Sequence, residues 1–274
     1  PAVEGGNPEQ QVAAIWSYLS LGDSMLLPAG IVPDKGTYEL TPTTEPIVFG
    51  ANMQGASART LAVGLPESAH YAWDMEHGRL AMCWHGAFMD AEGAWHGRNA
   101  SVQSPAGTNI LHLPAGHAVE LLDNRTRAWP LPKDRSPDGT RHDPWRTRGV
   151  ERDSARRPMF LLEQDGVRVR EHIVPRLARG GTHLNRIFTV YSDEARGDLY
   201  MRAAVAPSIE PGAGEGRHRR WRIGVDRSIE IRGADSFVRE DEHGVKELLV
   251  KVPLSFSGSD DAEFEGTFEV ELSW

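Results

Sequence analysis

Residues 159–173 read MFLLEQDGVRVREHI, which is the pattern of a β-hairpin. The Asp165-Gly166 pair in its middle is typical of a type I′ turn, where both central residues need a positive φ. After the turn, arginine and histidine alternate with Val, Val, Glu and Ile over 167–173. Such a two-residue period places the polar side chains on one face of a strand. The stretch therefore predicts two antiparallel strands with one face at least partly wet.

Similar runs, rich in β-branched and aromatic residues and separated by Gly, Pro and Asp, follow one another from about Thr37 onward. This spacing of short strands is typical of a β-sandwich. Trp73–Arg79 is predicted as a turn between two strands, whereas residues 85–116 and 128–157 show no strand pattern and are expected to be long loops. The expected strands lie near 45–49, 59–64, 69–74, 79–84, 117–122, 159–164, 167–174, 185–191, 198–205, 220–223, 228–232, 246–254 and 264–273.

The first part of the chain has a different period. Residues 7–22 read NPEQQVAAIWSYLSLG, with Asn7 as a good N-cap, Pro8 at the first helical position and Gly22 at the end. Their apolar residues recur at helical spacing and form one stripe, which needs a packing partner. We therefore expect a mainly β protein, a large antiparallel β-sandwich of which a mutarotase-like supersandwich is one form, preceded by one N-terminal α-helix. The expected division is a helical segment at 1–27, a linker at 28–44 and the sandwich at 45–274.

Charge, hydropathy and cysteine content narrow the range of possible functions. The net charge of −9 argues against a dedicated nucleic-acid binder, because such proteins neutralise phosphates with clustered Lys and Arg. No apolar run approaches the roughly 18 residues that span a bilayer, so no membrane span is expected. Cys83 is the single cysteine, which rules out an internal disulfide and a haem-attaching C-x-x-C-H motif. Its apolar surroundings predict a buried, unreactive thiol.

Residues 84–98 read WHGAFMDAEGAWHGR and hold the densest group of aromatic and polar side chains. Rings that stack on a sugar, beside fixed hydrogen-bonding groups, would suit carbohydrate recognition. The alternative is structural: Trp84, Phe88 and Trp95 would fill the core, and Asp90 would pair with Arg98. The candidate ligand-binding residues are Trp84, His85, Asp90, Trp95 and Arg98.

Two other chemistries have weaker support in the sequence. Four histidines in and next to the first long loop could be metal ligands, but their spacing matches no metal motif, so no metal site is predicted. Acidic pairs in turns could serve glycoside hydrolysis, yet neighbours in sequence do not set the separation that this chemistry needs. The histidines are His85, His96, His112 and His117, and the acidic pairs are Asp74 with Glu76 and Asp90 with Glu92.

Two stretches resemble a known family. Residues 8–19, PEQQVAAIWSYL, resemble the C-terminal helix of a class I cytochrome c. Residues 62–64 (AVG) and 79–80 (RL), with the 84–98 segment, are similar to the β-sandwich that follows the haem domain in large c-type cytochromes of the PVC-type haem-binding kind. The likeness extends over most of residues 5–205, although Asn99 stands where that pattern has glycine.

This resemblance implies that the chain is the C-terminal part of an exported, periplasmic or extracellular electron-transfer protein. Haem c would belong to a cytochrome c domain upstream of Pro1, and residues 1–27 would hold the last helix of that domain. No cofactor is then expected in the chain itself, since the attachment motif is absent. The expected partners are the upstream cytochrome c domain and a carbohydrate ligand.

Three functions stay open. The first is a non-catalytic accessory domain, carbohydrate binding being its candidate activity. The second is a sugar-active enzyme, epimerase-like or lyase-like, with its site in the loops at 85–116 and 128–157. It predicts a cleft with facing titratable groups of perturbed pKa. The third is a structural spacer, which predicts that Trp84 and Trp95 are both fully buried.

Overall fold

The computed structural model describes residue 12 and residues 38–96, 101–124, 126–131, 144–258 and 263–274. The chain divides into two units, Pro1–Tyr38 and Glu39–Trp274, and nearly all described residues belong to the second. The helix predicted over 7–22 lies outside the described residues except for Val12, which is helical. Most of the linker expected at 28–44 also lies outside them.

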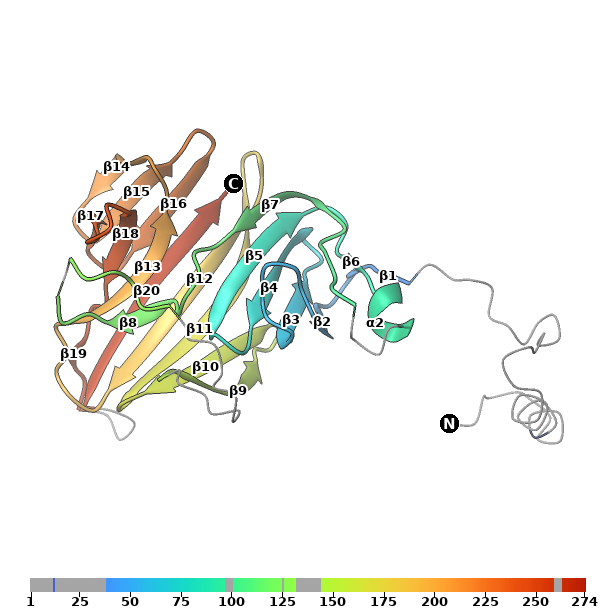
Figure 1. The fold of residues 1–274 in the computed structure, drawn as a ribbon, viewed down its shortest axis with the longest axis horizontal. Coiled ribbons are helices and arrows are strands. Elements are labelled where there is room, and N and C mark those ends of the chain that lie inside the picture. Colours follow the sequence, from blue (N-terminus) through green and yellow to red (C-terminus); the bar gives the residue numbers. More distant parts are fainter. Residues whose placement is uncertain (1–11, 13–37, 97–100, 125, 132–143, 259–262) are drawn as a thin grey trace. The chain divides into compact units, whose positions relative to one another are not determined.

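The second unit is mainly β, as predicted, and every pairing between its named strands is antiparallel in the described part of the chain (Figure 1). The largest sheet has the order β14 (Ile209–Glu215), β15 (His218–Ile223), β16 (Arg227–Arg232), β20 (Phe264–Ser273), β12 (Gly181–Ser192), β11 (Val167–Ala178), β10 (Pro158–Gln164) and β9 (Arg146–Arg152), with β19 (Ser255–Phe256) also paired to β20.

Three smaller sheets complete this unit. The five-stranded sheet has the order β2 (Ile47–Ala51), β3 (Thr60–Gly64), β4 (Ala69–Asp74), β5 (Arg79–His85) and β7 (Thr108–His112). The four-stranded sheet has the order β17 (Ser236–Glu240), β18 (Lys246–Lys251), β13 (Leu199–Val205) and β8 (Val119–Leu121). A two-stranded sheet joins β1 (Glu39–Leu40) to β6 (Met89–Asp90), and α2 (Glu92–His96) follows β6.

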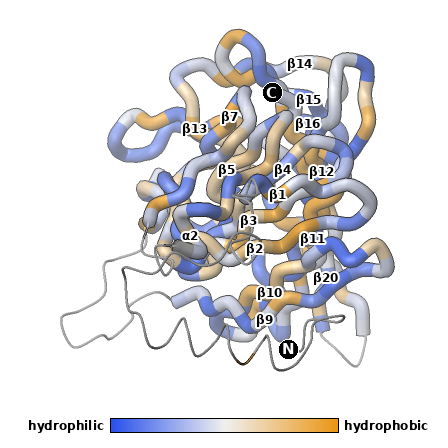
Figure 2. The backbone as a smooth tube through the Cα atoms, turned by 90° about the vertical axis from the view of Figure 1, so that its right-hand side faces the viewer, coloured by the Kyte–Doolittle hydropathy of each residue, from blue (hydrophilic) through white to orange (hydrophobic). Residues whose placement is uncertain are grey.

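One continuous core joins the large sheet to the five-stranded and four-stranded sheets, which makes the unit a β-sandwich. At its centre the Trp73 and Phe160 rings stack with centroids 4.1 Å apart, and Phe188 stacks on Phe268 at 4.9 Å. Hydrophobic residues are concentrated along strands such as β3, whereas β11 alternates hydrophobic and hydrophilic residues and many connecting loops are hydrophilic (Figure 2). A stacked aromatic pair stabilises the fold beyond the free energy gained by burying its apolar area. The geometry of these ring pairs therefore contributes to the stability of the core in addition to the hydrophobic effect.

An ion pair lies inside this core. The Glu171 carboxylate accepts hydrogen bonds from Arg186 Nε at 2.7 Å and from Trp73 Nε1 at 3.1 Å, and both charged side chains are almost fully buried. The Arg186 guanidinium also lies 4.9 Å from the centre of the Phe188 ring. Removal of either charge would leave the other desolvated without its counter-ion.

The hairpin predicted from Asp165-Gly166 is confirmed, with φ of 45° and 76° at these two residues. The long loops expected at 85–116 and 128–157 are partly wrong, because β6, α2 and β7 lie in the first and β9 in the second. Strand β7 exposes every residue except Leu111, and β9 is a charged edge strand. Neither strand carries the apolar alternation by which buried strands are recognised.

The turn predicted at 73–79 is confirmed between β4 and β5, and it is held by a buried carboxylate. Asp74 Oδ1 accepts from the backbone N–H of Glu76 and His77, and Asp74 Oδ2 accepts from His77 Nδ1 at 2.8 Å. The Ser57 hydroxyl donates to Oδ1 at 2.6 Å. Asp74 therefore closes its own turn instead of facing Glu76 as a catalytic pair.

These contacts predict a pH-dependent contribution to stability. Burial raises the pKa of Asp74, but hydrogen bonds from His77 and Ser57 and the charges of His77 and Arg79 outweigh it and lower the pKa to about 2. A depressed carboxyl pKa stabilises the fold above the unfolded-state pKa, by roughly 2 kcal/mol here, and this contribution is lost as the pH falls toward 2. Urea unfolding of the wild type and Asp74→Asn from pH 7 to pH 2 is expected to show the difference shrinking below about pH 4. A difference that stays constant with pH would contradict this origin.

Candidate functional site

The structure separates the four candidate ligand-binding residues that it describes, which are Trp84, His85, Asp90 and Trp95. Trp84 is fully buried in a second core cluster between the five-stranded sheet and the segment that carries Phe88 and Met89. Its ring stacks on Phe88, and its Nε1 donates to the carbonyl oxygens of Ala87 and Phe88 at 3.1 Å each. The indole has no exposed surface, so the core-packing interpretation holds for Trp84 and a stacking role on a ligand is excluded.

Asp90 and Trp95 lie around α2. The Asp90 side chain accepts a hydrogen bond from the backbone N–H of Glu92 at 2.8 Å and so caps this short helix. Trp95 is 57% exposed and touches Phe49 edge to face, with ring centroids 6.3 Å apart. The expectation that Trp95 fills the core is therefore wrong. Arg98 lies outside the described residues, and so does its expected pairing with Asp90.

His85 lies at the end of β5 in an open hollow. Its Nε2 donates to the carbonyl oxygen of Thr182 at 2.7 Å, which leaves Nδ1 to accept from Asn109 Nδ2 at 3.4 Å. The imidazole stacks on the Trp274 indole with centroids 4.2 Å apart and planes 21° from parallel. Trp274 Nε1 in turn donates to the Asn109 carbonyl oxygen at 2.6 Å. These contacts hold both rings at the same wall of the hollow.

The backbone beside His85 is fixed from the interior by a buried histidine. His70 Nε2 donates to the carbonyl oxygen of Gly86 at 2.8 Å, and its Nδ1 accepts from the backbone N–H of Leu65 at 3.0 Å. Burial lowers the pKa of His70, an effect that the hydrogen bond to Gly86 opposes and the nearby His85 reinforces. The neutral ring with one donor and one acceptor matches both partners. Gly86 is therefore held at its φ of 90° by an interior contact.

The hollow has a volume of about 560 Å³, which lies within the range of small-molecule sites, roughly 300–1,000 Å³. It is formed where β5, β7, β20 and the turn between β11 and β12 come together, and the C-terminus lies beside β7 (Figure 1). Polar side chains predominate around the two stacked rings. The lining consists of Glu67, Ser68, His85, Gly86, Asn109, Arg179, Gly180, Gly181, Thr182, His183, Ser273 and Trp274.

A line of hydrogen bonds runs along one wall of the hollow on β12 and β20. His183 Nδ1 lies 2.9 Å from Glu271 Oε1, and the Ser273 hydroxyl oxygen lies 3.0 Å from His183 Nε2. Glu271 Oε2 accepts from Arg232 at 2.8 Å and lies 3.2 Å from Arg176. These residues were not among the site residues predicted from the sequence. The alternation of β20 was visible, but the pairing of β20 with β12 was not.

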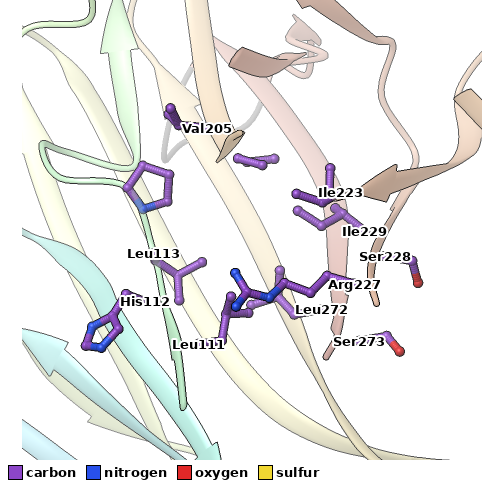
Figure 3. Close-up of a pocket in the computed structure, with 13 residues that line it drawn as sticks. Leu111, His112, Leu113, Val205, Ile223, Arg227, Ser228, Ile229, Leu272 and Ser273 are labelled. Atoms are coloured by element: carbon purple, nitrogen blue, oxygen red, sulfur yellow. The ribbon is translucent and has the colours of Figure 1, made fainter. Parts of the chain in front are cut away.

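A second pocket opens next to Ser273 between β7, β13 and β16. Figure 3 shows the Arg227 side chain extending across it toward Leu111 and His112. Its volume of about 40 Å³ leaves room for little more than a water molecule. The larger hollow is therefore the better candidate for a ligand.

Within the described ranges, no group of three or more His, Cys, Asp or Glu side chains is arranged to hold a metal ion. Cys83 is buried, as predicted, and burial raises the pKa of its thiol. None of the helices in the described residues is both long enough and apolar enough to cross a membrane.

Comparison with known proteins supplies no family assignment: no model of a protein family matches the chain, and no curated protein matches it significantly.

Proposed function

We propose that the sandwich is a carbohydrate-binding domain whose ligand occupies the hollow beside the stacked rings of His85 and Trp274. In the same proposal it is an accessory domain of an exported electron-transfer protein, with haem c in a cytochrome c domain upstream. The resemblance of residues 8–19 and 84–98 supports the second part, and the geometry of the hollow supports the first.

The observation that carries carbohydrate binding is the Trp274 indole, positioned at the edge of a polar hollow by His85 and Asn109. An aromatic ring offers an apolar face to the C–H groups of a sugar, while its surroundings bind the hydroxyl groups. Glu67 supplies acceptors, and Arg179 supplies donors, on other parts of the lining. The proposed site differs in location from the Trp84–Arg98 segment and shares only His85 with its candidate residues.

Calorimetric titration of the chain with neutral monosaccharides and their oligomers tests this proposal. We expect Trp274→Ala to weaken the binding of the best saccharide at least tenfold, which corresponds to about 1.4 kcal/mol. Trp95→Ala is the matched control, because Trp95 is an exposed tryptophan outside the hollow, and its affinity is expected to equal that of the wild type.

Saturable binding to no member of the panel, or equal losses in both variants, would refute a carbohydrate site in the hollow. The haem part is tested separately by the coding sequence upstream of Pro1, where a C-x-x-C-H motif is expected within roughly a hundred residues, the size of a small domain.

A further inference from the structure

Ser273, His183 and Glu271 form a connected chain of hydroxyl, imidazole and carboxylate on two neighbouring strands. The two contacts measure 3.0 Å from Ser273 Oγ to His183 Nε2 and 2.9 Å from His183 Nδ1 to Glu271 Oε1. A nucleophile within hydrogen-bonding reach of a base, with the base oriented by a third group, is the geometric signature of covalent catalysis. The three groups are therefore in the order that nucleophilic attack by a serine requires.

The register of the large sheet holds this chain of groups in place. Leu184 pairs with Leu272 and Asn185 with Glu271, which places His183 beside the end of β20. Since side chains alternate along a strand, His183, Glu271 and Ser273 share the outer face, while the two leucines point into the core. All three groups thus project from regular strands, which position side chains better than loops do.

The carboxylate has separate partners on its two oxygens. Oε1 faces His183, whereas Oε2 is bound by Arg232 and Arg176. Burial raises the pKa of Glu271, but the hydrogen bonds from His183 and Arg232 and the charges of both arginines outweigh it and lower the pKa. The ionised carboxylate accepts the His183 Nδ1 proton, so the Nε2 lone pair is left to accept the Ser273 hydroxyl proton.

Ser273 and His183 are among the residues that line the hollow, so the hydroxyl and the imidazole border the same space as Trp274. Arg179 and Asn109 line that hollow as well and carry N–H groups of the kind that stabilise a negative charge on an oxygen. The wall next to His183 includes the Gly180-Gly181 turn, whose φ values of 105° and 146° favour glycine, so these two positions place no side chain in the opening. The site thus combines a nucleophile, a base and donors around one accessible space.

We propose that Ser273, His183 and Glu271 hydrolyse esters, with O-acylated saccharides as the substrate class. The choice of saccharide rests on the proposed function, whereas the ester chemistry rests on the three side chains alone. This inference departs from the expectation of a non-catalytic domain and from the epimerase-like and lyase-like alternatives.

The reaction proceeds in two balanced steps. Ser273 Oγ attacks the ester carbonyl carbon and its proton passes to His183 Nε2; the bond to the sugar oxygen then breaks, and that oxygen takes the proton from His183. Water next attacks the acyl-serine, giving one proton to His183 Nε2, and this proton returns to Ser273 Oγ as the carboxylic acid leaves. Glu271 is a positioning residue, because it orients the imidazole without touching the substrate.

The test combines p-nitrophenyl acetate hydrolysis with labelling by a fluorophosphonate, located by mass spectrometry of peptides. We expect the label on Ser273, and we expect Ser273→Ala and His183→Gln to lower kcat/KM at least a hundredfold. Ser228→Ala is the matched control, since Ser228 pairs with Ser273 across β16 and β20, and it is expected to retain full activity. Glu271→Gln is expected to lower kcat with little change in KM.

Several outcomes would overturn the proposal: no labelling of the folded wild type, hydrolysis that persists in Ser273→Ala, or equal losses in Ser228→Ala. Circular dichroism and thermal unfolding of each variant separate a lost site from a lost fold. Assays with a peracetylated monosaccharide and calorimetry with its unacetylated parent separate the two proposals. Ester hydrolysis without saccharide binding removes only the proposed function, whereas binding without Ser273-dependent hydrolysis removes only the catalytic inference.

Discussion

Arg186→Met is expected to lower the free energy of unfolding by about 3–5 kcal/mol, because it leaves the Glu171 carboxylate buried without its counter-ion. Methionine fills much of the volume of the arginine stem, so little of the loss comes from a cavity. Trp73 Nε1 still donates to Glu171 at 3.1 Å, but one neutral donor does not compensate a desolvated charge. Urea unfolding followed by tryptophan fluorescence measures the change.

The double variant Glu171→Gln/Arg186→Met is the control for this mechanism. A neutral amide at position 171 keeps an oxygen for the Trp73 donor and removes the unpaired charge, so the double variant is expected to recover most of the lost stability. Recovery of this kind is the usual result when a buried ion pair is replaced as a whole. A double variant less stable than Arg186→Met, or a single variant within 1 kcal/mol of the wild type, would contradict the account.

Gly107→Ala is expected to destabilise the protein by roughly 3 kcal/mol, since the new methyl group has no space. A Cβ at this position would overlap the carbonyl oxygen of His85 and lie 2.7 Å from that of Ala87 and 2.8 Å from Trp84 Cδ1. Two of these three neighbours are backbone atoms, so the strain cannot be relieved by a rotamer change. Because the displaced segment includes His85, the variant is also expected to lower the affinity for any ligand that binds in the hollow.

Gly149→Ala provides the comparison for thermal unfolding, because a Cβ on Gly149 meets nothing within 4 Å. This change on the edge strand β9 is expected to alter the free energy of unfolding by less than about 0.5 kcal/mol. If both alanine variants unfold at the wild-type temperature, this would contradict the close contact between residues 105–108 and the end of β5.

The sandwich could be predicted because a strand with one buried face alternates apolar and polar residues, and this two-residue period is visible in the sequence. Strands β11 and β20 alternate apolar and polar residues, and Asp165-Gly166 marks a turn that needs positive φ at both positions. Strand β7 was missed because it exposes nearly all its side chains, so its hydrogen bonds are the only sign of it. Local patterns thus identify strands with a clear alternation of buried and exposed residues, whereas β14 and the partly buried β17, which lack it, were not predicted either.

The candidate site could be predicted only in part, since its residues are distant in sequence. His85 was identified from its neighbours, but Trp84 beside it points into a core, and sequence alone does not say which of two alternating faces is wet. Trp274 reaches His85, and Ser273 reaches His183, only through the pairing of β20 with β12. The register of β12 with β20 depends on residues far apart in the sequence, whereas a sequence motif describes only neighbouring residues. The contacts of Trp274 and Ser273 could therefore not be predicted from motifs.

Strand β9 has a consequence for the behaviour of the protein at high concentration. It ends the large sheet, and an edge strand with free backbone groups is a template on which a strand of another molecule can add. Here the edge carries exposed Arg146, Arg148, Glu151 and Arg152, which would have to lose water and face like charges if two such edges met. Clustered charge of this kind discourages the cross-β stacking by which open sheets aggregate.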